Sequence, residues 1–307
     1  MKVQQKKWIS TIAKICFSLS VLSFVCYQGK KELDNLSIEE SIKIFKSLSS
    51  IQFFSAVFLG ISAVFIMFFY DVLLVRSLKI SISLSKIFRV SWVANTLNGI
   101  LGFGGLIGAG VRFLLYKGHT TNPMKLIQGV AWMTMAMMSG LSFLSFLVAI
   151  NFFHGQPLLH SNAWLYFVLA GVVLFLPFYI ISSHIKGKNI ATPRLTLQYT
   201  VVSSLEWLAA ATVAYFCLSM VGGEVQLLTF YGIFFLSSVA GLLSLIPGGF
   251  GAFDIMLLVG LQTLGLDEEI VLTSIFLYRL VYYLIPFIIG LLLGTVEVIR
   301  ATFRPAQ

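Results

Sequence analysis

Charged side chains interrupt several otherwise apolar stretches of this sequence, and their types indicate recognition of a polar group inside a membrane. The positions are Lys14, Asp71, Arg112, Glu206, Asp254 and Arg279. A charge that faces lipid is energetically costly, so these side chains should face protein, water or a polar ligand. Arginine binds phosphate through two parallel hydrogen bonds, and a carboxylate binds an ammonium group. The mixture of signs favours a zwitterionic or cationic phospholipid headgroup over a simple ion.

Four of these residues also have a purely structural interpretation. Glu206 and Arg279 lie near the centres of two apolar runs and could form an ion pair that fixes helix packing. Asp254 follows a run rich in glycine, where its carboxylate would complement the positive end of a new helix. Asp71 lies near the end of its run, where it could be solvated or could pair two helices.

Enzyme and metal chemistry have little support in the sequence. The three cysteines lie inside apolar runs and the four histidines fall singly, so neither a disulfide pattern nor a metal pattern arises. No HExxH, GxSxG or P-loop motif occurs, and the glycine run at 102–110 lacks the strand and the acidic partner of a dinucleotide fold. We therefore expect no catalytic residue, no metal and no cofactor.

Membrane-spanning helices must position the charged residues. The chain has 307 residues, of which 58% are apolar and 11% charged, with a net charge of +9. Soluble domains carry roughly 25% charged residues, so one globular core cannot hide this apolar excess. About six continuous runs are long enough to cross a bilayer. They are approximately Trp8–Tyr27, Ile51–Val75, Met124–Phe152, Trp164–Ile181, Leu197–Val221 and Ile270–Val296. The sequence predicts an all-α polytopic bundle.

Two further apolar stretches, at about 87–116 and 225–264, are each broken in the middle by glycine and proline. Each stretch is therefore predicted to form a hairpin of two helical halves. Three predicted crossings separate the hairpins, so they should be inverted relative to each other. Paired interrupted segments of this kind point to a transporter's substrate site, although glycines at this spacing also serve close helix packing. The glycines that break the helices are Gly104, Gly105, Gly108, Gly248, Gly249 and Gly251.

The distribution of basic residues predicts the orientation. With the N-terminus in the cytoplasm, most lysines and arginines fall in cytoplasmic segments, as the positive-inside rule requires. The outer segments then hold only Lys30, Lys31, Lys43 and Lys46. We expect both termini in the cytoplasm. The amphipathic segment at 36–49, with a capping box of Ser37 and Glu40, predicts a helix on the outer membrane surface.

Several strings resemble a known family. They are Tyr70-Asp71-Val72, the glycine-rich run from Asn95 to Arg112, Glu206-Trp207, the run from Leu245 to Asp254, and Tyr278-Arg279. Together they are similar to the N-terminal membrane half of the bacterial multiple peptide resistance factor family, the lysylphosphatidylglycerol synthases and flippases. The resemblance covers nearly the whole chain.

This resemblance implies a function. The chain would carry lysyl-phosphatidylglycerol from the inner to the outer leaflet of the bacterial cytoplasmic membrane, giving resistance to cationic antimicrobial peptides. The five charged positions match the family pattern. Arg112 and Arg279 would then contact the lipid phosphate, and Asp71, Glu206 and Asp254 the lysyl ammonium groups.

The family's soluble synthase domain has no counterpart in this chain, so residues 1–307 would form a single transmembrane flippase-type domain without catalysis of its own. The alternatives are a phosphatidylglycerol lysyltransferase or its membrane subunit, a transporter of another lipid-linked substrate, and a membrane scaffold. The expected partners are phospholipid, a separate synthase chain and further copies of the chain. We expect no direct contact with nucleic acid.

Overall fold

The computed structural model describes residues 38–101, 105–186, 191–244, 247–249 and 251–302, and every regular element in these ranges is helical. Five helices are long and apolar enough to cross a membrane: Ser50–Ser77, Pro123–Ala149, Trp164–Ile185, Pro193–Met220 and Glu268–Glu297. They coincide with five of the predicted crossings. The run Trp8–Tyr27, with Lys14, lies outside the described residues. The predicted all-α polytopic bundle is confirmed.

The long crossings are built from eight helical elements. Their bounds are α3 Ser50–Ile66, α4 Phe68–Ser77, α7 Pro123–Ala149, α9 Trp164–Lys186, α10 Pro193–Met220, α13 Glu268–Tyr278, a π-helical turn Arg279–Leu284 and α14 Ile285–Thr302. Side-chain caps begin several of them. The Asn122 side chain accepts from the Lys125 amide before α7, and the Thr192 side chain accepts from the Leu195 amide before α10. A proline follows each cap at the first helical position, where its missing N–H is harmless.

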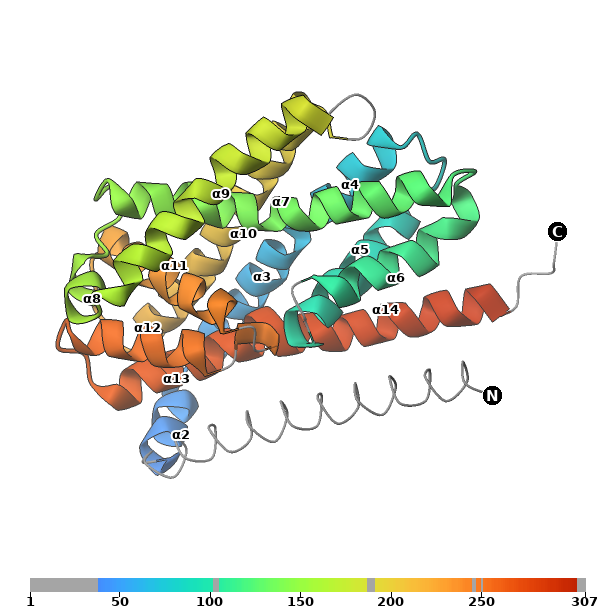
Figure 1. The fold of residues 1–307 in the computed structure, drawn as a ribbon. Coiled ribbons are helices and arrows are strands. Elements are labelled where there is room, and N and C mark those ends of the chain that lie inside the picture. The colour runs from blue at the N-terminus through green and yellow to red at the C-terminus, as the bar shows by residue number, and fades with distance from the viewer. Residues whose placement is uncertain (1–37, 102–104, 187–190, 245–246, 250, 303–307) are drawn as a thin grey trace, which may run out of the picture.

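Both interrupted stretches form helical hairpins. The first consists of α5 (Leu84–Leu101) and α6 (Leu106–Tyr116), and the second of α11 (Leu227–Leu243), the short turn Pro247–Gly249 and α12 (Ala252–Gln262). Three long helices, α7, α9 and α10, separate them along the chain. The hairpins accordingly enter from opposite ends of the bundle, and the described helix ends that lead into their turns lie near its middle (Figure 1). The turn of the second hairpin packs against α5 of the first.

Short elements complete the ends of the bundle. They are α2 (Ile38–Ser47), a 3₁₀ turn at Lys117–His119 and α8 (Gln156–Ser161). The amphipathic helix predicted at 36–49 is present as α2, and its Phe45 ring packs edge-on against Phe276 of α13 at 6.1 Å between centroids. The predicted cap Ser37 lies outside the described residues. The cap that the structure does describe here is Ser49, which forms a capping box with Gln52 at the start of α3.

Close backbone approaches determine where the last crossing lies. A Cβ added at Gly60 of α3 would lie 2.4 Å from the Val281 carbonyl oxygen in the π-helical turn. One added at Gly290 of α14 would lie 2.3 Å from the Thr96 hydroxyl of α5. The Trp92 indole also donates to the Pro286 carbonyl, at 2.9 Å. These contacts hold the π-helical turn and α14 against α3 and the first hairpin, beside the middle of the bundle.

Candidate functional site

A cavity of about 280 Å³ lies between the two hairpin turns. Its walls come from both hairpins and from α3, α7, α10, α13 and the π-helical turn. The polar side chains that line it are Asn95, Thr96, Asn98, Thr134, Glu206, Trp207, Ser238, Tyr278, Tyr282 and Tyr283. Membrane interiors seldom hold polar groups without a function, so this cavity is the candidate site.

The carboxylate in the cavity wall is Glu206 of α10. Its side chain is buried, with 7% of the residue exposed, and it accepts a hydrogen bond of 2.5 Å from the Tyr70 hydroxyl of α4. The ion pairs within the described ranges join Arg89 to Glu297, Arg112 to Asp71 and Arg279 to Asp254. Glu206 therefore has a hydrogen-bond donor but no cationic partner in the part of the chain that the structure describes.

Tyrosine rings form the wall beside Glu206. Tyr278 and Tyr282 stack at 5.3 Å between ring centroids, and Tyr283 meets both edge-on at 5.7 and 5.1 Å. Tyr282, four residues after Tyr278, would share its face in an α-helix as well, and the extra residue of the π-helical turn brings Tyr283 to the same cavity. A carboxylate beside the faces and edges of tyrosines is a favourable environment for an ammonium group.

The turn of the second hairpin brings backbone to the cavity. Gly248 and Gly249 line it with φ angles of 67° and 64°, and Gly251 has a φ of 87°. These angles lie in the left-handed region, which glycine adopts without strain. The glycine run therefore allows the chain to turn within the bundle and leaves backbone groups, without side chains, in the cavity wall.

An ion pair on the side of this turn that faces away from the cavity stabilises it. The Arg279 guanidinium donates from Nε and Nη2 to the Asp254 carboxylate at 2.9 to 3.1 Å, and from Nη1 to the Gly248 carbonyl at 2.9 Å. It also lies over the rings of Phe253 and Tyr283, at 5.2 and 4.8 Å from their centroids. Asp254 additionally accepts from the Gly251 amide at 3.0 Å and so caps α12. Its predicted helix-end role is confirmed, together with a second role in the ion pair.

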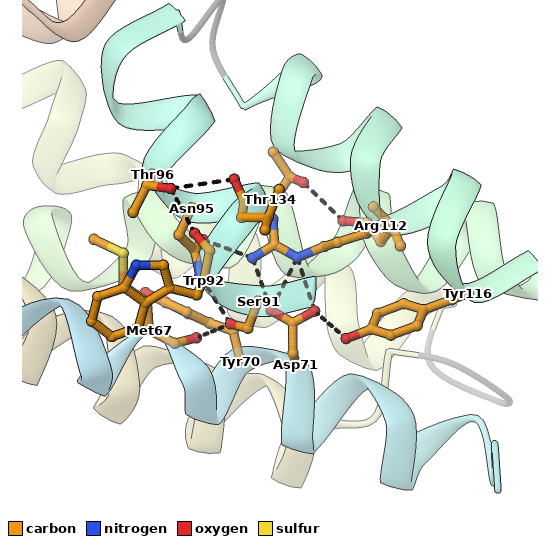
Figure 2. Close-up of polar contacts among 12 residues, drawn as sticks. Met67, Tyr70, Asp71, Ser91, Trp92, Asn95, Thr96, Arg112, Tyr116 and Thr134 are labelled. Carbon is orange, nitrogen blue, oxygen red and sulfur yellow. Dashed lines mark hydrogen bonds and ion pairs between the residues drawn. The ribbon is translucent and has the colours of Figure 1, made fainter. Parts of the chain in front are cut away.

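A second ion pair holds the first hairpin. Arg112 of α6 donates from Nε and Nη2 to Asp71 of α4 at 2.9 to 3.1 Å, and from Nη2 to the Asn95 side chain of α5 at 2.7 Å. The Tyr116 hydroxyl donates to the same carboxylate at 3.0 Å. Figure 2 shows these side chains converging from α4, α5 and α6. The pair is fully buried, and neither Asp71 nor Arg112 lines the cavity.

The alternative of an ion pair between Glu206 and Arg279 is wrong. Arg279 is bound to Asp254 of the second hairpin, and Glu206 is bound to Tyr70. Both residues lie near the middle of their helices, as predicted. Depth in the membrane does not determine which face of a helix a side chain occupies, and these two side chains have different partners.

The structure separates the five predicted site residues into three places. Glu206 lines the cavity, the pair Asp254 and Arg279 lies directly behind its wall, and the pair Asp71 and Arg112 lies in the first hairpin away from the lining. The glycines also differ: Gly105, Gly248 and Gly249 line the cavity, and Gly104 lies outside the described residues. Gly108 instead serves close packing, since a Cβ there would lie 2.9 Å from the Ala94 carbonyl oxygen.

Sequence reasoning did not identify Tyr70, Asn95, Asn98 and Tyr116. Tyr70 and Tyr116 are the hydroxyl donors to Glu206 and Asp71, and the Asn98 side-chain oxygen is buried beside the cavity without a hydrogen-bond partner. The available signal was an amide or hydroxyl inside an apolar run, which is common in membrane helices. No cluster of metal-ligating side chains occurs among the described residues.

Lipid-facing surface adjoins both hairpin turns. Leu101 and Leu106 flank the first turn and Leu243 precedes the second, and 45%, 71% and 49% of these residues are exposed. Exposed leucines at the middle of a membrane bundle face lipid chains. The cavity between the turns therefore lies next to surface that hydrocarbon can reach.

The family model and the similar proteins found by comparison indicate the same family. The family model described as "Lysylphosphatidylglycerol synthase TM region" matches residues 11–290. The phosphatidylglycerol lysyltransferase of Bacillus subtilis (strain 168) is 40% identical over 306 residues, covering 97% of this chain and 36% of that protein. The proteins of the same name from Staphylococcus aureus strains MRSA252 and COL are 40% and 39% identical, each over 97% of this chain and 35% of theirs. The chain spans about a third of the length of these curated relatives.

Proposed function

The chain belongs to the lysylphosphatidylglycerol synthase transmembrane-region family, and from this premise we propose that it moves lysyl-phosphatidylglycerol from the inner to the outer leaflet of the bacterial cytoplasmic membrane. The observation that supports this most is the polar cavity between two inverted hairpins, with Glu206 in its wall and exposed leucines beside both turns. A headgroup could enter such a cavity while its acyl chains stay in lipid.

The site chemistry fits a lipid with two ammonium groups and one phosphate. We propose that one ammonium binds Glu206 against the tyrosine wall, since that carboxylate has no cationic partner in the described ranges. Arg279 would receive the phosphate. A phosphate that replaced the Asp254 carboxylate would preserve the two parallel hydrogen bonds of the guanidinium, and it would release Asp254 for the second ammonium.

Asp71 and Arg112 contribute differently in this proposal. Their charges neutralise each other in a dry environment, and Asn95 and Tyr116 add one hydrogen bond each to Arg112 and Asp71. Contact between either residue and the lipid requires the pair to open. In the described conformation they hold α6 against α4 and so position the first hairpin turn at the cavity.

The proposed orientation has an electrostatic consequence. Arg76, Lys79, Lys86 and Lys117 lie at the ends of α4, α5 and α6, at the base of the first hairpin. The positive-inside rule places this end in the cytoplasm. Outward movement of a lipid with net positive charge is then opposed by an inside-negative potential, by about 2.3 kcal/mol per elementary charge per 100 mV.

Leaflet-resolved labelling tests the transport proposal. Cells that contain a separate lysyl-phosphatidylglycerol synthase domain, with and without this chain, are treated with an amine reagent that does not cross membranes. We expect the chain to raise the outer fraction of the lysyl lipid at constant total amount. Glu206→Ala and Arg279→Ala should abolish this rise, whereas Glu224→Ala, in the exposed loop after α10, should not. An unchanged leaflet ratio with the folded chain present would contradict the proposal.

A second candidate function follows from the relatives' name, phosphatidylglycerol lysyltransferase. The chain could support lysyl transfer as a membrane subunit of such an enzyme. The same labelling separates the two functions, because support of synthesis raises total lysyl lipid at a fixed leaflet ratio. Transfer of lysine from lysyl-tRNA to phosphatidylglycerol by the purified chain alone would establish catalysis within it.

A further inference from the structure

Glu206 is a buried carboxylate whose negative charge the described protein does not balance. It lies in the cavity wall with 7% of the residue exposed, and among the described residues its hydrogen bond comes from a neutral tyrosine, Tyr70. All arginines found in ion pairs within the described ranges are bound to other carboxylates. An isolated charge in a membrane interior is so costly that such a carboxylate must hold either a proton or a cation.

Among the described residues, the groups around Glu206 supply no such cation. From α4 it meets the Tyr70 hydroxyl, and Tyr282 of the π-helical turn and Arg112 of α6 interact with it electrostatically. Arg112 is itself held by Asp71. The remaining cavity walls contribute Val64 from α3, Thr134, Met137 and Met138 from α7, Phe234 and Ser238 from α11, and Tyr278 from α13. None of these carries a positive charge.

We propose that Glu206 binds a proton and the lipid's ammonium group in alternation, so that the chain is a lipid–proton exchanger. This inference rests on the proposed function and adds its coupling ion. An empty cavity is neutral when Glu206 is protonated, and a loaded cavity is neutral at this carboxylate when an ammonium replaces the proton. An empty cavity with a deprotonated Glu206 has the highest free energy. After the chain releases a lipid at the outer face, Glu206 therefore binds a proton before the cavity opens again to the inner face.

Charge balance makes this exchange effective for a cationic lipid. Lysyl-phosphatidylglycerol has two ammonium groups and one phosphate, so one net positive charge moves outward with each molecule. One proton that moves inward on Glu206 cancels that charge. The complete cycle is then electroneutral, and a membrane potential no longer opposes export. The proton enters at the outer face and leaves at the inner face, with no covalent step.

Reconstituted vesicles test the coupling. The full chain is inserted into phosphatidylglycerol vesicles that contain lysyl-phosphatidylglycerol and a pH-sensitive dye in the lumen, and an impermeant amine reagent reports the outer leaflet. With the outside more acidic by about one unit, we expect the outer-to-inner ratio of lysyl lipid to approach about tenfold, with one proton entering per lipid. A potassium diffusion potential at equal pH should leave the ratio unchanged.

Variants of Glu206 and a matched control test whether this residue carries the proton. Glu206→Gln keeps the size of the side chain and should abolish both lipid movement and proton entry, whereas Glu206→Asp should retain both. Glu224→Gln, the same change at an exposed position, should behave as the unmodified chain.

Three results would contradict the inference, and they are distinguishable. Lipid movement that follows the potential and brings in no protons overturns the proton exchange while leaving lipid transport standing. Absence of lipid movement under every gradient, by a folded chain, overturns the proposed function together with its coupling. Proton-coupled movement that persists in Glu206→Gln would show that another group carries the proton.

Discussion

The two hairpins are held by ion pairs of the same chemistry in different surroundings. In the first hairpin the arginine belongs to the hairpin and the aspartate to a crossing helix, and 2% and 0% of the two side chains are exposed. In the second hairpin the aspartate belongs to the hairpin and the arginine to a crossing helix, and 17% of the aspartate side chain and 12% of the arginine side chain are exposed. The first pair lies away from the cavity, and the second directly behind its wall.

This difference indicates different roles. Breaking a dry, buried pair leaves an uncompensated charge, so the structure favours Asp71 and Arg112 as a clamp that stays closed. Arg279 lies near the cavity and between two aromatic rings, which would stabilise it while it changed anionic partners. The second hairpin is therefore the better candidate for the element that responds to a lipid.

Removing the charge of Asp71 should have the largest effect. Asp71→Asn leaves Arg112 charged and buried, and loss of one partner of a buried pair costs about 3–5 kcal/mol. We expect a large fall in the thermal midpoint of the purified chain in detergent. Asp254→Asn should lower it less, because water can reach that pair more easily. Equal losses of stability in the two variants would contradict the proposal that the Asp71–Arg112 pair stays closed while the Asp254–Arg279 pair responds to the lipid.

The same substitution at two tyrosines tests the proposed difference between the Asp71–Arg112 pair and the cavity. Tyr116→Phe removes the hydroxyl that donates to Asp71, and Tyr70→Phe removes the one that donates to Glu206. Each loses one hydrogen bond to a carboxylate, worth about 1.5–3 kcal/mol. We expect Tyr116→Phe to lower thermal stability without changing the initial rate of lipid movement, and Tyr70→Phe to change that rate. The opposite assignment would show that the clamp, and not the cavity, meets the lipid.

Glycine substitutions should give the smallest effect. Gly249 has a φ of 64°, so Gly249→Ala forces a side chain into the left-handed region at a cost of about 1–2 kcal/mol. A Cβ at Gly110 of α6 would meet no atom within 4 Å, so Gly110→Ala should be neutral or slightly stabilising. We expect only Gly249→Ala to reduce both stability and transport. A harmless Gly249→Ala would mean that the turn does not need its observed backbone.

Much of the fold could be predicted from the sequence, because apolar run length and glycine breaks report directly on membrane helices. The five described crossings, both hairpins and the depth of Glu206 and Arg279 follow from those signals. The pairing of charges could not be predicted. Asp71 and Arg112 are separated by 41 positions, and only the packing of α4 against α5, and of α5 against α6, brings them together.

The cavity wall was also only partly predictable. The π-helical turn at Arg279–Leu284 changes which side chains share a face, so α-helical periodicity alone would place Tyr283 away from the face of Tyr278. Tyr70 and Asn98 lie within strings that carry the family resemblance, but their residue types gave no further signal than a polar group in an apolar run. Their importance depends on what lies opposite: a carboxylate for Tyr70 and the open cavity for Asn98.

Photo-crosslinking is the most direct test of whether the cavity between the hairpins binds the lipid. A lysyl-phosphatidylglycerol analogue with a photoreactive lysyl group would be added to the chain in membranes, and the labelled peptides identified by mass spectrometry. We expect labels on α10 near Glu206 and on the π-helical turn, reduced by unlabelled lysyl-phosphatidylglycerol and lost in Glu206→Gln. Labels confined to lipid-facing helices, and unchanged in that variant, would contradict the proposed site.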